Sequence, residues 1–106
     1  MPKYLIQSTY TREGVEGVRT KGGTARRDAV AALVRSLGGE LESYYFGFGD
    51  YDVHAVLDLP DAEAAAAIAL VVDAAGGATT KTTALLSPEQ IDEAARRSAD
   101  YRPPGS

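Results

Sequence analysis

A regular alternation of side chains defines a strand over residues 53–59, near the middle of the chain. One side of this strand carries only apolar residues, namely Val53, Ala55, Leu57 and Leu59. The other side carries His54, Val56 and Asp58. Successive side chains of a strand point to opposite faces of a sheet, so we expect one face to pack on a core and the other to meet more polar surroundings. Glycines and acidic residues at positions 47–52 join this strand to another at 40–46, which predicts a β-hairpin.

Helices are predicted before the hairpin. A stripe with the i, i+3, i+4, i+7 spacing of a buried helix face predicts one that ends at Gly38-Gly39, and its members are Val30, Leu33, Val34 and Leu37. We expect Thr24 to cap it. A poorer helix or turn, capped by Thr11 and weakened by two glycines, is expected to precede it and to end at Gly22-Gly23.

A further helix and the last strand follow the hairpin. Asp61 is the expected N-cap of a helix that stops at Gly76-Gly77 and carries along one side Ala64, Ile68, Val71, Val72 and Ala75. Residues 4–10 and 79–86 are rich in β-forming side chains and complete the set of strands. Ser87-Pro88-Glu89-Gln90 predicts a capping box at the start of a short amphipathic helix that runs to about residue 98.

The order of elements is β-α-β-β-α-β with a short C-terminal helix, which predicts an α+β protein of the ferredoxin-like arrangement. Its four antiparallel strands would carry helices on one face and leave the other bare. A protein of 106 residues commonly covers such a face with a copy of itself, so we expect a homodimer or a higher homo-oligomer. We expect a single domain over residues 1–98 and a flexible tail over 99–106.

Composition and charge narrow the classes of function. The chain has no cysteine, which excludes disulfides and thiolate metal sites, and a cytoplasmic location fits but is not required. A net charge of −4 argues against nucleic-acid binding. The apolar run at 64–72 is too short to span a membrane, and the start of the chain leads straight into a strand, so we expect no membrane association and no signal peptide. A single histidine among scattered carboxylates gives no metal-ligand spacing, and we expect no metal and no cofactor.

The hairpin segment Gly49-Asp50-Tyr51-Asp52 resembles the signature of the GYD domain family. Further likenesses span roughly residues 3–97 and comprise Tyr10-Thr11 with Gly14, Leu37-Gly38-Gly39, Asp58-Leu59-Pro60-Asp61 and the threonine-rich residues 80–84. The resemblance implies a dimeric α+β barrel in which two ferredoxin-like subunits pack sheet against sheet. It implies no particular chemistry, because related barrels include monooxygenases, isomerases, cyclases, haem enzymes and simple ligand binders.

Three residues are candidates for proton transfer. His54 has an unperturbed pKa near neutrality and is a candidate general base, although a hydrogen-bonded histidine in a subunit interface fits the same pattern. Tyr51 and Asp52 either form the polar rim of a pocket or serve the hairpin, with Asp52 bonding backbone N–H groups of the turn and Tyr51 covering the sheet end.

Aromatic residues and cations are candidates for ligand binding. The aromatic side chains expected to meet a flat ligand are Tyr10, Tyr45, Phe48 and Tyr51, with core and interface packing as the alternative. Lys21, Arg26 and Arg27 flank Gly22-Gly23, where an anion could bind, although a glycine pair before a helix is more often a simple joint.

Three functions fit these observations. The first is a protein that binds a small apolar or aromatic molecule, either between sheet and helices or inside a barrel. The second is a cofactor-independent isomerase, cyclase or monooxygenase that uses His54, or Tyr51 with Asp52, for proton transfer. The third is a purely structural subunit with no ligand.

Overall fold

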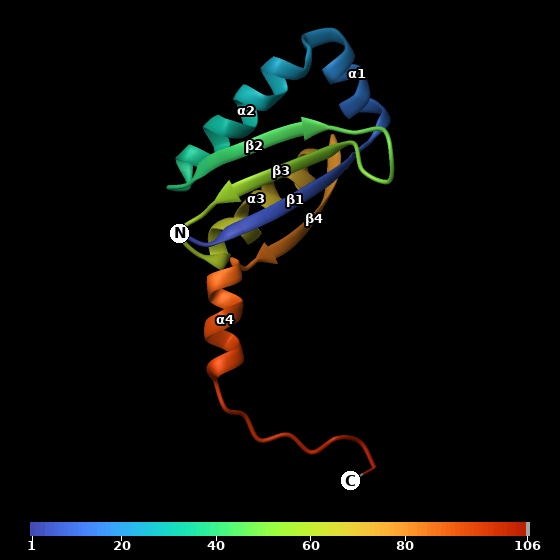
Figure 1. Ribbon diagram of the computed structural model, residues 1–106. Helices are drawn as coiled ribbons and strands as arrows, with labels where there is room; N and C mark the ends of the chain where they lie inside the picture. Colours follow the sequence, from blue (N-terminus) through green and yellow to red (C-terminus); the bar gives the residue numbers. More distant parts are fainter. Residues whose placement is uncertain (106) are drawn as a thin grey trace.

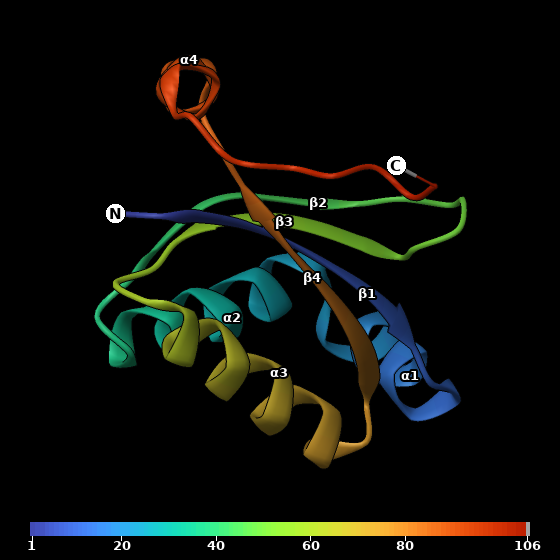
Figure 2. The same cartoon turned by 90° about the horizontal axis from the view of Figure 1, so that it is seen from below.

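The computed structural model describes residues 1–105 and contains a four-stranded antiparallel sheet with three helices on one face (Figures 1 and 2). The elements in chain order are β1 (Lys3–Tyr10), α1 (Arg12–Lys21), α2 (Gly23–Ser36), β2 (Glu40–Phe46), β3 (Val53–Asp58), α3 (Ala62–Ala75), β4 (Ala78–Leu85) and α4 (Pro88–Arg96). The strands are arranged β2-β3-β1-β4 across the sheet. This is the predicted ferredoxin-like α+β arrangement, with α1 added ahead of α2 and α4 at the end.

The two central strands, β1 and β3, supply the largest share of the core. Ile6 of β1 lies opposite Ala55 of β3 and Thr82 of β4, so these side chains share the face that the helices cover. The buried apolar residues are Tyr4, Ile6, Val34, Val53, Ala55, Leu57, Leu59, Ala64, Ala65, Ile68 and Ala78. The alternation predicted for residues 53–59 is thereby confirmed, because His54, Val56 and Asp58 are only half-buried on the opposite face.

One end of the sheet is held by a bulge and an ion cluster. Leu41 lies opposite Leu57 whereas Ser43 lies opposite Val56, so Glu42 is an extra residue in β2. Such a bulge bends its strand and increases the local twist. The Nζ atom of Lys3 is 2.8 Å from a carboxylate oxygen of Glu42 and 2.8 Å from one of Asp58, which links β1 to β2 and β3.

The start of α2 differs from the prediction. Thr24 was expected as its cap, but the helix begins at Gly23 and follows Gly22, which provides no side-chain cap. Gly22 has a φ of +90°, so α1 turns directly into α2 at this one residue. A Cβ atom on Gly23 would lie 2.8 Å from Cε2 of Phe46, so the bare backbone there lets the first turn pack against that ring.

The other predicted helix boundaries are confirmed by their hydrogen bonds. The Thr11 hydroxyl accepts from the Gly14 N–H at 3.2 Å, and α1 is a helix of ten residues rather than a turn. The Asp61 carboxylate accepts from the Ala64 N–H at 2.9 Å. Ser87 and Gln90 form the predicted capping box, with donor–acceptor distances of 3.1 and 2.8 Å.

The C-terminal helix α4 projects from the body of the molecule beyond β4 (Figure 1). All of its residues are exposed, including Ile91 at 51%. Residues 97–105 follow it without a helix or strand. The flexibility expected of this tail stays a prediction.

Candidate functional site

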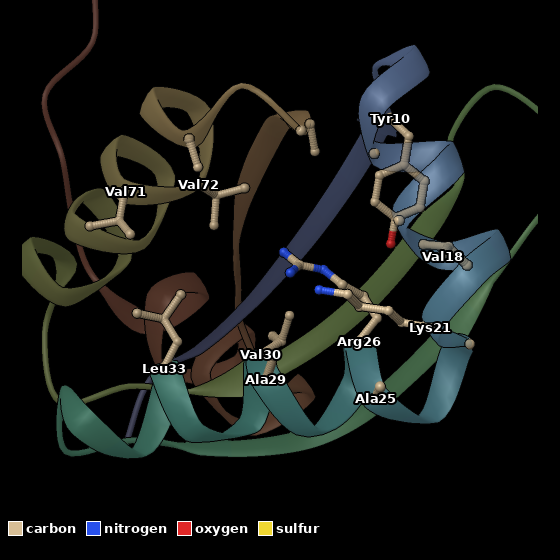
Figure 3. Close-up of a pocket in the computed structure, with 16 residues that line it drawn as sticks. Tyr10, Val18, Lys21, Ala25, Arg26, Ala29, Val30, Leu33, Val71 and Val72 are labelled. Carbon is tan, nitrogen blue, oxygen red and sulfur yellow. The ribbon is translucent and has the colours of Figure 1, made fainter.

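A cavity of about 560 Å³ lies between the sheet and the three helices that cover it. Its walls come from α1, α2 and α3, and its floor comes from the end of β1 and the start of β4. Figure 3 shows side chains from all three helices around this space. Pockets that hold small molecules commonly enclose about 300–1,000 Å³, so the cavity has room for a small organic molecule.

The cavity exists because α2 and α3 are anchored on opposite edges of the sheet. α2 packs on β2 and α3 packs on β4. Small residues face the space between them and do not fill it, and these are Gly17, Ala25, Ala29 and Ala75. The gap between the helices therefore stays open above the sheet.

The walls of the cavity are apolar. Val30 and Leu33 of α2 lie across from Val71 and Val72 of α3 (Figure 3). Val71 is 55% exposed, although it lines a cavity inside the helix layer. Apolar surface that remains in contact with water favours the binding of another apolar group. These walls therefore suit the apolar body of a ligand.

One end of the cavity is cationic. Lys21 is the last residue of α1, Arg26 lies in α2, and Figure 3 shows the nitrogen atoms of both pointing into the cavity. Neither side chain forms an ion pair within residues 1–105. The described part of the chain also contributes no aspartate or glutamate to the lining. Two positive charges thus face a space without a balancing carboxylate.

Two tyrosine hydroxyls extend this polar end toward the sheet. The Tyr10 and Tyr44 oxygens are 3.3 Å apart, and Tyr44 lines a small adjoining hollow of about 30 Å³ beneath Arg26 and Val30. Burial raises the pKa of Tyr44 above its usual value, the hydrogen bond with Tyr10 adds to the effect, and nearby Arg26 opposes it. Tyr44 is therefore protonated at neutral pH. When it donates to Tyr10, the Tyr10 hydroxyl is left to donate into the cavity.

Asp52 serves the backbone of the neighbouring strand. Its Oδ2 atom accepts a hydrogen bond of 2.8 Å from the Tyr10 N–H, and its own N–H donates to the Ser8 carbonyl at 2.8 Å. The hairpin role expected of Asp52 is thus a backbone contact, but the donor belongs to β1 rather than to the turn. This contact fixes the end of β1 and so positions Tyr10 at the cavity.

His54 and Tyr51 lie together on the opposite face of the sheet. The Nδ1 atom of His54 is 3.4 Å from Nε2 of Gln7, and its ring lies edge-on to Tyr51 with centroids 6.3 Å apart. The Nζ atom of Lys81 is 6.0 Å from the centre of the Tyr51 ring. Neither His54 nor Tyr51 lines the cavity. Proton transfer by either residue therefore stays a prediction, and it would have to take place on the bare face of the sheet.

Of the four aromatic residues predicted to meet a ligand, only Tyr10 lines the cavity. Tyr45 is 69% exposed on the bare face of the sheet, and Phe48 is fully exposed in the hairpin connection. Tyr44 and Phe46 point toward the helices, with ring centroids 5.4 Å apart. The hairpin aromatics therefore divide between the two faces of the sheet, as strand alternation requires.

The sequence named Arg26 as a candidate for anion binding and a site between sheet and helices as one option, but it did not identify the apolar residues of α2 as walls of a cavity. Arg26, Ala29, Val30 and Leu33 line it and recur at the spacing of one helix face. That spacing could have assigned Arg26 to the apolar face of α2, because Arg26 lies three residues before Ala29 and four before Val30, whereas Arg27 falls on another face. Arg27 pairs with Asp28 at 3.2 Å and does not line the cavity.

The described residues contain neither a cluster of metal ligands nor a helix that could span a membrane. Residues 1–105 contain no group of three or more histidine, aspartate or glutamate side chains that could hold a metal ion. Across the same residues, every helix is too short or too polar to cross a lipid bilayer.

Fold and site together define a small α+β protein with a solvent-open cavity beneath its helices that is apolar along its walls and cationic at one end. Comparison with family models matches the GYD domain over residues 4–95. The chain therefore belongs to the GYD domain family. Neither the curated proteins nor the solved structures give a significant match.

Proposed function

We propose that this protein binds a small apolar or aromatic molecule in the cavity between the sheet and helices α1, α2 and α3. The observation that carries the proposal is the open, apolar volume of about 560 Å³ within the helix layer. Small-molecule sites are typically concave and mostly apolar, with a few polar groups that orient the ligand. Tyr10, Lys21 and Arg26 are such groups in this cavity.

The test compares two alanine-to-phenylalanine substitutions on helices. Ala29 lines the cavity, whereas Ala66 is an exposed residue of α3 that does not. Ala29→Phe should fill part of the cavity and prevent a naphthalene or decanol probe from shifting the amide resonances of cavity residues in NMR spectra. Ala66→Phe should leave those shifts unchanged. Probe-induced shifts that persist in Ala29→Phe would refute this location.

We also propose that the bare face of the sheet binds a second copy of the chain. Leu5, Tyr45 and Val56 leave apolar surface on this face of the isolated chain. Apolar surface on a sheet face is commonly covered by association. The dimeric α+β barrel implied by the family would place this face between two subunits.

The charges on this face support a second copy as the occupant. Glu42 and Asp58 lie at one end beside Lys3, while Lys81 and His54 lie farther along. Two copies stacked in opposite directions would therefore bring Glu42 and Asp58 of one toward Lys81 of the other.

Native mass spectrometry tests this assembly. The wild-type protein should give a dimer or a higher oligomer, and Val56→Glu should shift it to a monomer because it places a charge in the apolar centre of the face. Ala66→Glu is the control on the helix side and should retain the oligomer. A monomeric wild-type protein would refute the assembly without affecting the cavity.

A further inference from the structure

The cationic end of the cavity is unusual for a chain with an excess of acidic residues. The protein has 15 aspartates and glutamates against 11 lysines and arginines. Within residues 1–105, none of these carboxylates lines the cavity, while Lys21 and Arg26 both do. Within residues 1–105, this pair of positive charges thus has no carboxylate partner, and the apolar walls reduce the screening by water more for half-buried Arg26 than for exposed Lys21.

The local backbone brings the two cations together. The chain passes from α1 to α2 at Gly22, so the end of one helix and the first turns of the next meet at the cavity. Lys21 is exposed and Arg26 is half-buried, so their charged ends meet the space from its solvent side and its deeper side respectively. The first N–H groups of α2 lack a side-chain cap, but the positive end of the α2 dipole meets the negative end of the α1 dipole at this joint, so the positive potential comes from Lys21 and Arg26 themselves.

The deeper hydroxyls add hydrogen-bond donors at the same place. The oxygen of Tyr10 points into the cavity in Figure 3, and Tyr44 lies 3.3 Å behind it. A guanidinium presents a planar set of N–H donors that matches the two oxygens of a carboxylate. Arg26 and Tyr10 together therefore suit a planar anion better than a neutral group.

We propose that the ligand is an amphipathic carboxylic acid, with its carboxylate bound by Arg26 and Lys21 and its apolar or aromatic body lying between Leu33 and Val72. This inference rests on the proposed function, because it assigns a chemical class to the molecule that the cavity binds. The apolar walls explain why an inorganic anion alone is a poor occupant: it would leave the surface of α2 and α3 exposed to water.

Matched pairs of probes test the charge separately from the shape. Naphthoate and naphthamide share an aromatic body, and decanoate and decanamide share an aliphatic one, while only the acids carry a negative charge at neutral pH. Isothermal titration calorimetry should show at least one acid binding about tenfold more tightly than its amide, the size expected for hydrogen bonds to a charged group. High salt should reduce this preference.

Substitutions then assign the preference to particular residues. Arg26→Gln should lower the affinity for the acid about fivefold and leave the amide nearly unaffected, so that a small preference due to Lys21 remains. Arg27→Gln is the matched control, because Arg27 carries the same charge on the same helix outside the cavity. A double variant, Arg26→Gln with Lys21→Gln, should remove the preference altogether. Circular dichroism checks that each variant is folded.

The possible failures are distinguishable. If acid and amide bind equally and Ala29→Phe blocks both, the cavity binds small molecules but the assignment of an acid is wrong. If the acid is preferred equally by wild type and the double variant, another cation binds it and the assignment to Arg26 and Lys21 is wrong. If none of the four probes binds to the folded protein, the proposed function and this inference both fail.

Discussion

The close contact between α1 and the turn after α3 gives the sharpest test of the structure. Gly14 of α1 packs against Gly77, and a Cβ atom added to Gly14 would overlap with the carbonyl oxygen of Gly77. The same Cβ would lie 2.9 Å from Cδ1 of Tyr10. The Gly77 oxygen accepts hydrogen bonds from the N–H and the hydroxyl of Thr11, at 3.0 and 3.1 Å. Gly14→Ala must therefore displace backbone that is already hydrogen-bonded.

The expected loss of stability follows from three effects. Forcing an extra carbon into a packed site typically costs about 1–3 kcal/mol. Each hydrogen bond of Thr11 that is weakened by the displacement contributes about 1 kcal/mol. The higher helix propensity of alanine opposes this loss by adding about 1 kcal/mol to the free energy of unfolding. If both hydrogen bonds are weakened, we expect Gly14→Ala to lower the free energy of unfolding by about 2–4 kcal/mol.

Gly17 provides a control in the same helix. A Cβ atom on Gly17 would have no neighbour within 4 Å, so only the propensity effect applies and Gly17→Ala should stabilise the protein by about 1 kcal/mol. Urea unfolding followed by circular dichroism would measure both changes. A Gly14→Ala protein as stable as the wild type would refute the close packing of α1. Equal destabilisation by both substitutions would instead show that α1 tolerates no added side chain.

Further changes address the tyrosine pair, the hairpin and the opposite face. Because burial raises the pKa of Tyr44 above 10.0, the unfolded chain loses this proton first as the pH rises, so stability should fall in alkaline solution. Tyr44→Phe should reduce this loss of stability, measured by urea unfolding at increasing pH. It should not abolish the loss, because the carboxylates of Asp58 and Glu42 also raise the pKa of Lys3. An unchanged pH profile would contradict the contribution of Tyr44. Asp52→Ala should lower the free energy of unfolding by about 1–2 kcal/mol, because the Tyr10 N–H loses its acceptor. Asp52→Asn should lower it less in the same assay, because the amide retains an oxygen that can accept. Equal losses would argue against this hydrogen bond. His54→Ala should leave the calorimetric affinity for naphthoate unchanged because His54 lies on the other face of the sheet, and a marked loss would place the ligand there instead.

The fold was predictable because its signals are local. The capping box at Ser87 needs only four consecutive residues, and the helix end at Gly38 follows from the left-handed φ of +83° that glycine adopts easily. The alternation around His54 likewise fixes which side chains of β3 face the core. Each of these patterns acts over a few residues, so a single sequence contains the whole of it.

The cavity was not predictable because it depends on distances between elements. The sequence shows Lys21 and Arg26 near a glycine pair, but only the packing of α2 beside α3 places Val72 across from them. The role of Asp52 depends in the same way on its contact with the end of β1, where Tyr10 provides the N–H. The prediction of Thr24 as the cap of α2 was wrong for a similar reason, because the contact between Gly23 and the ring of Phe46 depends on how β2 packs against the start of the helix.

Because α2 packs on one edge strand and α3 on the other, the twist of the sheet sets the width of the cavity between the helices. Rotation of β2 and β4 relative to each other would change the distance between the two helices, and the bulge at Glu42 lies in one of these edge strands. Flattening the sheet from its bare side would change the spacing of the cavity walls from behind. A second copy of the chain on that face, as proposed above, would therefore change the width of the cavity through the curvature of the strands, from the side of the sheet opposite the cavity.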